Sequence, residues 1–161
     1  MLDRSMFILT FAAAIGSGLV GGIFYAFSTF VMAALGRLAP EQGIAAMNAI
    51  NVTVINPLFF LAFFGTGLVC LALIAGSFVW WGHAGGKLVL LASLIYLISC
   101  IGVTMFFNVP LNNALAAVKT MTLESAALWS GYLRDWTFWN HVRTVGPLIS
   151  AVLFTLALIL K

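Results

Sequence analysis

The sequence predicts an all-α fold, an integral membrane four-helix bundle that forms one domain over residues 1–161. The composition is the first observation behind this prediction: 63% of the residues are hydrophobic, 7% are charged, and the mean hydropathy is +1.15. Soluble domains carry about a quarter charged residues, so this chain lacks the polar side chains that would cover a globular surface. The second observation is a set of four apolar segments, each close to or above the roughly 20 residues that cross a bilayer: 6–35, 57–80, 87–107 and 142–160.

The first two segments have recognisable starts and ends. The N-terminal apolar run continues past Phe30, further than the roughly 7–15 residues of a signal-peptide core, and we expect it to be retained as the first membrane helix. Asn56 and Pro57 open the second segment, because asparagine caps helix N-termini and proline suits the first helical position. Trp80 and Trp81 end it, as aromatic residues do at membrane interfaces.

The connections divide the molecule into two sides. The stretch WGHAGG (81–86) is short and predicts a tight hairpin between the second and third segments. The longer connections, 36–56 and 108–141, would both lie on the opposite side, which we call the polar side. In the second of them Pro110 can open a short helix, and Thr122 can cap another that can run without a break into the fourth segment. We therefore expect one or two extra helices in the connection between helices three and four.

Several classes of function are disfavoured. The seven Lys and Arg residues are scattered singly, so there is no basic patch for nucleic acid. Cys70 and Cys100 lie inside apolar runs and suit the role of small hydrophobic residues. No cluster of three or four ligands predicts a metal site, and no Walker, HExxH or GxSxG motif is present. We expect an integral protein of the plasma (inner) membrane that contacts membrane lipid, and a homo-oligomer remains an open alternative.

The asparagines gather on the polar side of the chain. Polar groups at membrane depth are costly unless they are satisfied or functional. Capping explains Asn56 fully, but Asn108, Asn112 and Asn113 are more amides than one helix end requires. We take these three as candidate site residues, with capping as the alternative. The full set is Asn48, Asn51, Asn56, Asn108, Asn112, Asn113 and Asn140.

A second pattern precedes the last apolar segment. Trp129, Tyr132, Trp136, Trp139 and Arg143 follow spacings of three, four, three and four, which place them on one face of a helix. One interpretation is a belt of aromatic residues at the lipid interface. The functional interpretation is an aromatic wall for a planar ligand, with Arg143 making a cation–π contact with Trp139.

Two further residues are candidates by position. His141 lies off the aromatic face and is the only histidine on the polar side, since His83 belongs to the WGHAGG turn. One histidine cannot form a tetrahedral metal site, but it can be the axial ligand of a haem. Tyr25, near the polar-side end of the first segment, can line a cavity.

Four stretches together resemble a known family: GGIFYAFSTFVM (21–32), QGIAAMNAINVTVINP (42–57), FNVPLNNALA (107–116) and WTFWNHVRT (136–144). They are similar to the corresponding stretches of the small four-helix membrane proteins called the DUF1772 or anthrone oxygenase-like family. One departure is Ala33, where many relatives have a proline. The resemblance implies oxidation of anthrones to anthraquinones by O₂. It places the site at Asn108, Asn112, Asn113, Trp139, Asn140, His141 and Arg143.

The resemblance also implies roles for these residues. The substrate would be a lipophilic, anthrone-like aromatic molecule whose delocalised anion reacts with O₂ without a cofactor. His141 would be the base, Asn108 and Asn112 or Asn113 would donate to the developing oxyanion, and Arg143 would stabilise the anion. Asn113, Trp136, Trp139, Asn140 and Tyr25 would bind the substrate. Two alternatives stay open: a haem-binding redox protein with His141 as axial ligand, and a non-enzymatic binding or accessory protein.

Overall fold

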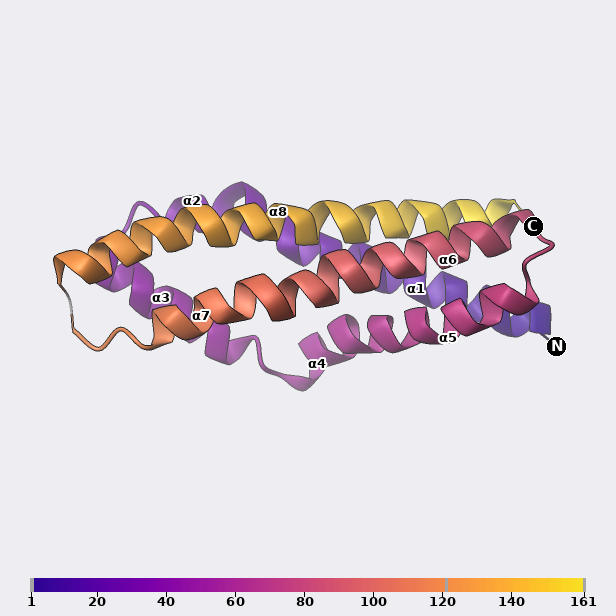
Figure 1. Ribbon diagram of the computed structural model, residues 1–161, viewed down its shortest axis with the longest axis horizontal. Coiled ribbons are helices and arrows are strands. Elements are labelled where there is room, and N and C mark those ends of the chain that lie inside the picture. Colours follow the sequence, from indigo (N-terminus) through magenta and orange to yellow (C-terminus); the bar gives the residue numbers. More distant parts are fainter. Residues whose placement is uncertain (1, 121, 161) are drawn as a thin grey trace.

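The computed structural model describes residues 2–120 and 122–160, and it shows four long helices packed side by side (Figure 1). No strand occurs in the described part of the chain. The helices and π-helical turns, in order, are α1 (Leu2–Ala26), η1 (Phe27–Val31), α2 (Met32–Leu35), α3 (Pro40–Thr53), α4 (Pro57–Phe60), η2 (Leu61–Gly65), α5 (Thr66–Val79), α6 (Ala84–Tyr96), η3 (Leu97–Gly102), η4 (Thr104–Asn108), α7 (Val109–Ala116) and α8 (Leu123–Ile159).

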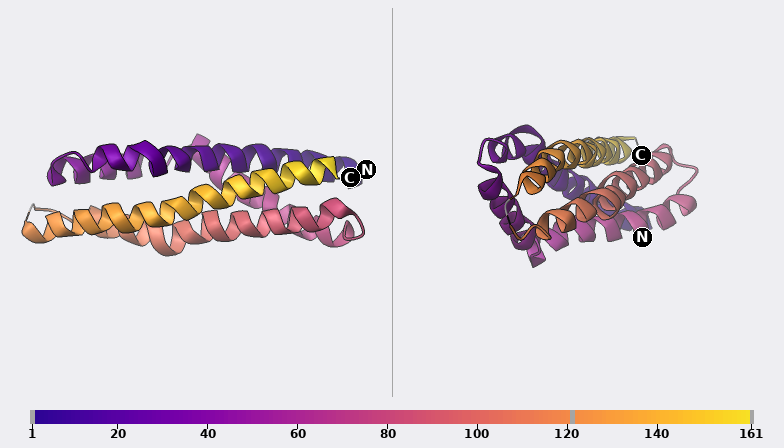
Figure 2. Two further views of the ribbon diagram at one scale, coloured as in Figure 1. Left: turned by 90° about the horizontal axis from the view of Figure 1, so that it is seen from above. Right: turned by 60° about the vertical axis from the view of Figure 1, so that its left-hand side comes forward.

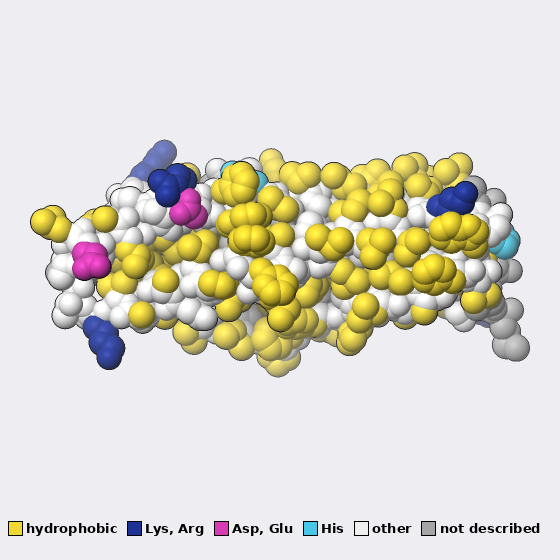
Figure 3. All heavy atoms as spheres, viewed as in Figure 1, with side chains coloured by type: hydrophobic (Ala, Val, Ile, Leu, Met, Phe, Trp, Pro, Cys, Tyr) yellow, Lys and Arg dark blue, Asp and Glu magenta, His cyan; other side chains and the backbone are white. Residues whose placement is uncertain are grey.

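The predicted membrane fold is confirmed. Four helical segments among the described residues are long and apolar enough to cross a membrane: Arg4–Leu35, Pro57–Val79, Gly85–Ala116 and Leu123–Ile159. Both chain ends and the α5–α6 turn lie at one end of the bundle, and α3, α7 and the start of α8 lie at the other (Figures 1 and 2). Hydrophobic side chains cover most of the surface seen in Figure 3, and charged ones gather toward the two ends.

The third and fourth helices are longer than the apolar segments from which they were predicted. Pro110 lies in the first turn of α7, where its missing N–H is tolerated, so the third helix continues to Ala116. The helix that starts after Thr122 runs without a break through the predicted boundary at 142 to Ile159. The extra helices between spans three and four are therefore continuous with those spans.

Two predicted helix caps are present. The Oδ1 atom of Asn56 accepts a hydrogen bond from the Phe59 amide at 3.0 Å. The Oγ1 atom of Thr122 accepts one from the Ser125 amide at 3.2 Å, and the Thr122 amide donates to the Ser125 hydroxyl at 2.7 Å. These bonds satisfy amides that a helix start leaves unpaired, which explains why α4 and α8 begin where they do.

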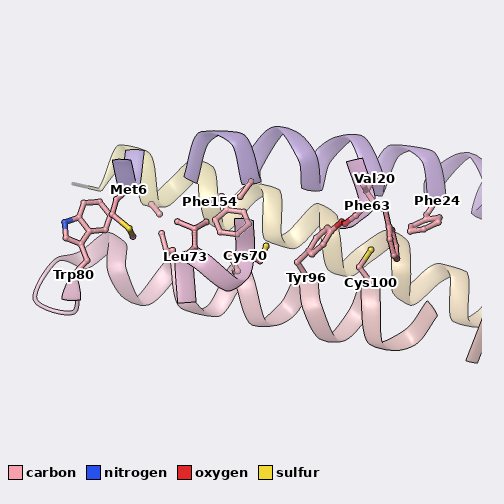
Figure 4. Close-up of a cluster of buried hydrophobic side chains, with 14 residues drawn as sticks. Met6, Val20, Phe24, Phe63, Cys70, Leu73, Trp80, Tyr96, Cys100 and Phe154 are labelled. Carbon is pink, nitrogen blue, oxygen red and sulfur yellow. The ribbon is translucent and has the colours of Figure 1, made fainter. Parts of the chain in front are cut away.

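Two hydrophobic cores stabilise the bundle. The first lies between the four spans, where Tyr96 donates a hydrogen bond to the carbonyl of Phe63 at 2.9 Å and the free thiols of Cys70 and Cys100 are fully buried (Figure 4). The second lies toward the polar side and joins α3 and α7 to the first half of α8. Its buried members are Met32, Leu35, Ile44, Met47, Leu115, Trp129, Tyr132 and Trp136.

Gly146 lies where α8 packs closely against the third span. A Cβ atom at this position would overlap the side chain of Ser99, whose hydroxyl already donates to the Ile95 carbonyl at 2.6 Å. We expect Gly146→Ala to lower the free energy of unfolding by about 1–3 kcal/mol, the usual cost of overpacking a core.

The matched control for this prediction is Gly131→Ala, on the same helix, where a Cβ atom meets nothing within 4 Å. Alanine stabilises a helix by about 1 kcal/mol relative to glycine. The free energy of unfolding of the control should therefore equal or exceed that of the parent. Unfolding of the purified variants in detergent by heat or SDS measures both. Equal stability of Gly146→Ala and the parent would show that α8 and the third span are not this closely packed.

Candidate functional site

The polar side of the bundle contains a cavity of about 290 Å³. Most of its wall is apolar, and only five lining residues have nitrogen or oxygen atoms in the side chain: Asn51, Thr104, Asn112, Trp136 and Arg143. The wall draws on every span, including the π-helical turns η1, η2 and η4. Such turns are rare and occur frequently at functional sites. The remaining lining residues are Ile23, Phe24, Phe27, Met47, Ile50, Val54, Ile55, Phe59, Phe60, Phe63, Phe64 and Val109.

Arg143 is the charged group of the cavity. Its side chain is 4% exposed, and its guanidinium lies between two aromatic rings, 4.3 Å from the centroid of Phe24 and 4.8 Å from that of Trp136. The Nη2 atom donates to Oδ1 of Asn140 at 2.8 Å, and Nη1 donates to Oγ1 of Thr104 at 3.3 Å. The predicted cation–π contact therefore involves Trp136 and Phe24 in place of Trp139.

Among the residues that the structure describes, no carboxylate pairs with this charge. The one ion pair among the described residues joins Arg134 to Asp135 on the surface, and the partners of Arg143 are a neutral amide and a hydroxyl. Its Nε atom has no hydrogen-bond partner. A buried charge without a counter-ion costs several kcal/mol. The arrangement therefore favours an anion at this end of the cavity.

Asn140 holds Arg143 in place and does not line the cavity. Its side chain is fully buried, and its Nδ2 atom donates to the Phe24 carbonyl and to the Ser28 hydroxyl, each at 2.8 Å. Its Oδ1 atom accepts from Arg143. All of its polar atoms are thus engaged within the protein, and Asn140 is a positioning residue that links α1 and η1 to the guanidinium.

The three clustered asparagines separate in the structure. Asn112 lines the cavity, and its Oδ1 atom accepts the hydroxyl proton of Tyr132 at 2.8 Å, so its Nδ2 atom remains as a donor. Asn108 is fully buried and donates to the Trp136 carbonyl at 3.2 Å, while its Oδ1 atom has no partner. Asn113 is exposed and lies outside the cavity wall.

The aromatic face of α8 is present, but only part of it reaches the cavity. Trp129, Tyr132 and Trp136 are buried and stacked in sequence, with centroids 5.6 and 6.1 Å apart. Trp136 lines the cavity, and its Nε1 atom has no hydrogen-bond partner. Trp139 instead stacks on Phe107 at 3.6 Å, and Tyr25 is 55% exposed on the outer surface. Neither of these two lines the cavity.

His141 lies on the other side of α8. Its ring is exposed and borders a shallow, apolar depression with Phe138 and Ser99. The reason is helical geometry: at 3.6 residues per turn, His141 and Arg143 point about 160° apart around the helix. The structure thus does not bring the predicted base to the cavity, nor does it place a histidine there to ligate a haem. Among the described residues no group of three His, Cys, Asp or Glu side chains could hold a metal ion.

Sequence reasoning missed three residues of the site. Asn51 was noted only among the polar-side asparagines, yet it lines the cavity and its Nδ2 atom has no hydrogen-bond partner. Thr104 and Phe24, which contact the guanidinium, come from the third span and the first span, respectively. Phe24 lies within GGIFYAFSTFVM, so the resemblance marked its segment without indicating its contact.

Comparison with known proteins identifies the family of the chain. The family model described as anthrone oxygenase matches residues 59–153. No curated protein and no solved structure matches the chain. The matched segment covers more than half of the 161 residues and includes Thr104, Asn112, Trp136 and Arg143. The chain therefore belongs to the anthrone oxygenase family.

Proposed function

We propose that this member of the anthrone oxygenase family uses O₂ to oxidise a lipophilic aromatic small molecule that binds in the cavity beside Arg143. One observation carries the proposal: a buried guanidinium, which has no carboxylate partner among the described residues, forms part of a largely apolar wall. Such a site binds a neutral ring system weakly, with the polar end of the molecule toward Arg143. It binds the corresponding anion much more strongly. An environment of this kind selects for a reaction in which negative charge develops on a lipophilic molecule.

Anthrone chemistry meets this requirement. Loss of a proton from the methylene carbon to water gives an anion whose charge is delocalised onto the carbonyl oxygen. One electron then passes from this anion to O₂, and the resulting radical and superoxide combine through a carbon–oxygen bond. Return of a proton gives a hydroperoxide, and loss of water from it leaves the second carbonyl. The balance is anthrone plus O₂ giving anthraquinone plus water, without an external reductant.

The lining residues divide this work. Arg143 faces the charge that develops on the substrate oxygen, and its delocalised, always charged guanidinium needs no reorganisation during the reaction. The Nδ2 atom of Asn112 and the unpaired donors of Asn51 and Trp136 are further candidates for the oxyanion. The phenylalanines of the cavity wall flank the rings of the substrate. This assignment needs no metal or haem, because the substrate anion is itself the reductant of O₂.

The test is O₂ consumption by the purified protein in nanodiscs with anthrone as the probe. We expect a rate above the spontaneous oxidation of anthrone, one anthraquinone formed per O₂ consumed, and no accumulation of H₂O₂. Empty nanodiscs supply the spontaneous rate. An absorption spectrum of the same preparation tests the haem alternative, since a Soret band that shifts in His141→Ala would support it. Anthrone oxidation no faster than in empty nanodiscs would reject this substrate.

The variant His141→Ala tests whether the reaction takes place in the cavity or on the outer face of α8. Because the His141 ring is exposed and outside the cavity, we expect the variant to retain kcat/KM for anthrone within a few-fold of the parent. Loss of a general base would instead cost about 10²–10⁴-fold in rate. A loss of that size in a folded variant would place the chemistry on the outer face beside Ser99 and Phe138.

A further inference from the structure

We infer that the cavity opens sideways into the hydrocarbon of the bilayer, through a mouth formed by Ile55, Phe60, Phe64 and Val109. Through this mouth a lipophilic molecule dissolved in the membrane would enter with its polar end directed toward Arg143. The inference rests on the cavity being the binding site proposed above. It adds the route by which the ligand enters, which neither the family nor the geometry of Arg143 specifies.

The mouth is defined by exposure. Four cavity-lining side chains are also strongly exposed on the outside of the bundle: Ile55 at 65%, Phe60 at 41%, Phe64 at 45% and Val109 at 40%. The other lining residues are buried or half-buried. A residue that both lines a cavity and faces outward borders its opening, so the opening lies between the start of the second span and the start of α7.

The surroundings of the mouth are apolar. Along the second span, Phe60 and Phe64 are followed by Leu68 and Leu71, so the four residues have spacings of four, four and three. Leu68 is 67% exposed and Leu71 is 54% exposed. The four side chains form one stripe on the outer face of the second span. Leu61, beside the mouth, is 72% exposed. Apolar side chains this exposed on a membrane span are in contact with lipid, because a water-filled entrance would be lined with polar groups.

The inner end of the cavity has the opposite character. Arg143 and Trp136 are each 4% exposed, and each has a donor nitrogen without a partner. Polarity therefore rises from the mouth inward. A molecule that carries an acidic or carbonyl oxygen on an apolar ring system gains most when the oxygen points inward and the rings fill the phenylalanine-lined part.

Phe64 is placed to control the width of the mouth. Its ring packs edge-on against Phe60 at 5.3 Å and against Phe63 at 4.9 Å between centroids. It belongs to the π-helical turn η2 (Leu61–Gly65). Exposed side chains change rotamer on the picosecond to nanosecond timescale, so the Phe60 and Phe64 rings can admit a flat molecule without movement of a helix.

Cysteine labelling in nanodiscs tests the route without requiring turnover. The reporter is Ile50→Cys in the cavity wall, and the water-exposed control on the same helix is Glu41→Cys. The native chain, whose two thiols are fully buried, supplies the blank. The probes are N-phenylmaleimide, which is neutral, flat and membrane-soluble, and a disulfonated stilbene maleimide, which stays in water. We expect Glu41→Cys to react with both probes and Ile50→Cys to react with N-phenylmaleimide alone.

Variants that change the width of the mouth test its position. In the Ile50→Cys chain, Val109→Trp should slow labelling by N-phenylmaleimide about tenfold, equivalent to about 1.4 kcal/mol in the barrier, and Phe64→Ala should accelerate it. The control Leu68→Trp adds the same bulk to the lipid-facing stripe one turn beyond the mouth and should change nothing. Size-exclusion chromatography confirms that each variant is folded.

Three outcomes would overturn the inference. Equal labelling of Ile50→Cys by the charged probe would show a route from water. Equal slowing by Val109→Trp and Leu68→Trp would show that the mouth lies elsewhere. No labelling of Ile50→Cys by either probe would show a closed cavity. Because the readout is a thiol adduct, labelling as expected with no anthrone oxidation would keep the route and reject the proposed reaction.

Discussion

Replacing Arg143 with glutamine is expected to lower kcat/KM for anthrone by about 10²–10³-fold, the usual cost of removing one preorganised group that stabilises an oxyanion. Glutamine keeps a side-chain donor on a shorter chain and lacks the charge. The loss should appear mainly in kcat, because the charge develops on the substrate only as the reaction proceeds. O₂ consumption in nanodiscs, measured across a range of anthrone concentrations, gives both constants.

Two variants control this prediction. Arg134→Gln removes a charge from the same helix, but Arg134 is exposed and paired with Asp135, so its kcat/KM should equal that of the parent. Arg143→Lys keeps the charge and loses the planar fork that stacks between Phe24 and Trp136, so it should recover only part of the rate. Parental activity in Arg143→Gln would remove the guanidinium from the mechanism.

Stability measurements distinguish a functional charge from a structural one. A buried charge without a counter-ion opposes folding, and its replacement by a neutral group of similar volume is often neutral or stabilising. Arg143→Gln should therefore unfold at the same temperature as the parent or higher, while it loses activity. A Tm well below that of the parent would assign Arg143 to the bundle core. The hydrogen bonds to Asn140 and Thr104 would then be its main contribution.

The arrangement of the four spans could be predicted from the sequence, because local features determine where the helices lie and where two of them begin. The apolar segments locate the spans, and the caps at Asn56 and Thr122 locate two helix starts through one or two hydrogen bonds each. The lengths of the third and fourth helices could not be predicted from hydropathy, since the side chains that extend α8 are tryptophans and tyrosine packed on α3 and α7. That packing depends on long-range contacts that no local pattern contains.

The cavity that forms the candidate site shares only some residues with the sequence-based prediction. The spacing of Trp129, Tyr132, Trp136 and Arg143 indicated one helix face, and these side chains do share it. Which rings meet the guanidinium depends on how α8 packs against α1, because one ring, Trp136, comes from α8 and the other, Phe24, comes from α1. His141 was selected as the one histidine on the polar side and through the resemblance, although helical geometry places it about 160° around α8 from Arg143.

A second large effect is expected when the charge of Arg143 is neutralised without changing Arg143 itself. Thr104 lines the cavity and accepts a hydrogen bond from the guanidinium at 3.3 Å. An aspartate at this position would form a buried ion pair with Arg143, and the cavity would then hold no net positive charge. We expect Thr104→Asp to reduce kcat/KM for anthrone about 10²-fold, comparable to loss of an oxyanion-stabilising group.

Thr104→Asn is the control for this prediction, because asparagine has the shape of aspartate and can accept the same hydrogen bond without a charge. It should retain activity within a few-fold of the parent, so the ratio between the two variants isolates the electrostatic effect from the change in shape. Thr104→Asp should also resist heat unfolding at least as well as Thr104→Asn, because the carboxylate supplies the missing counter-ion. Equal activity of the two variants in O₂ consumption would show that the net charge of the cavity is irrelevant to turnover. The unpaired guanidinium would then contribute to structure alone, and the amides of Asn51 and Asn112 would be the remaining donors for the oxyanion.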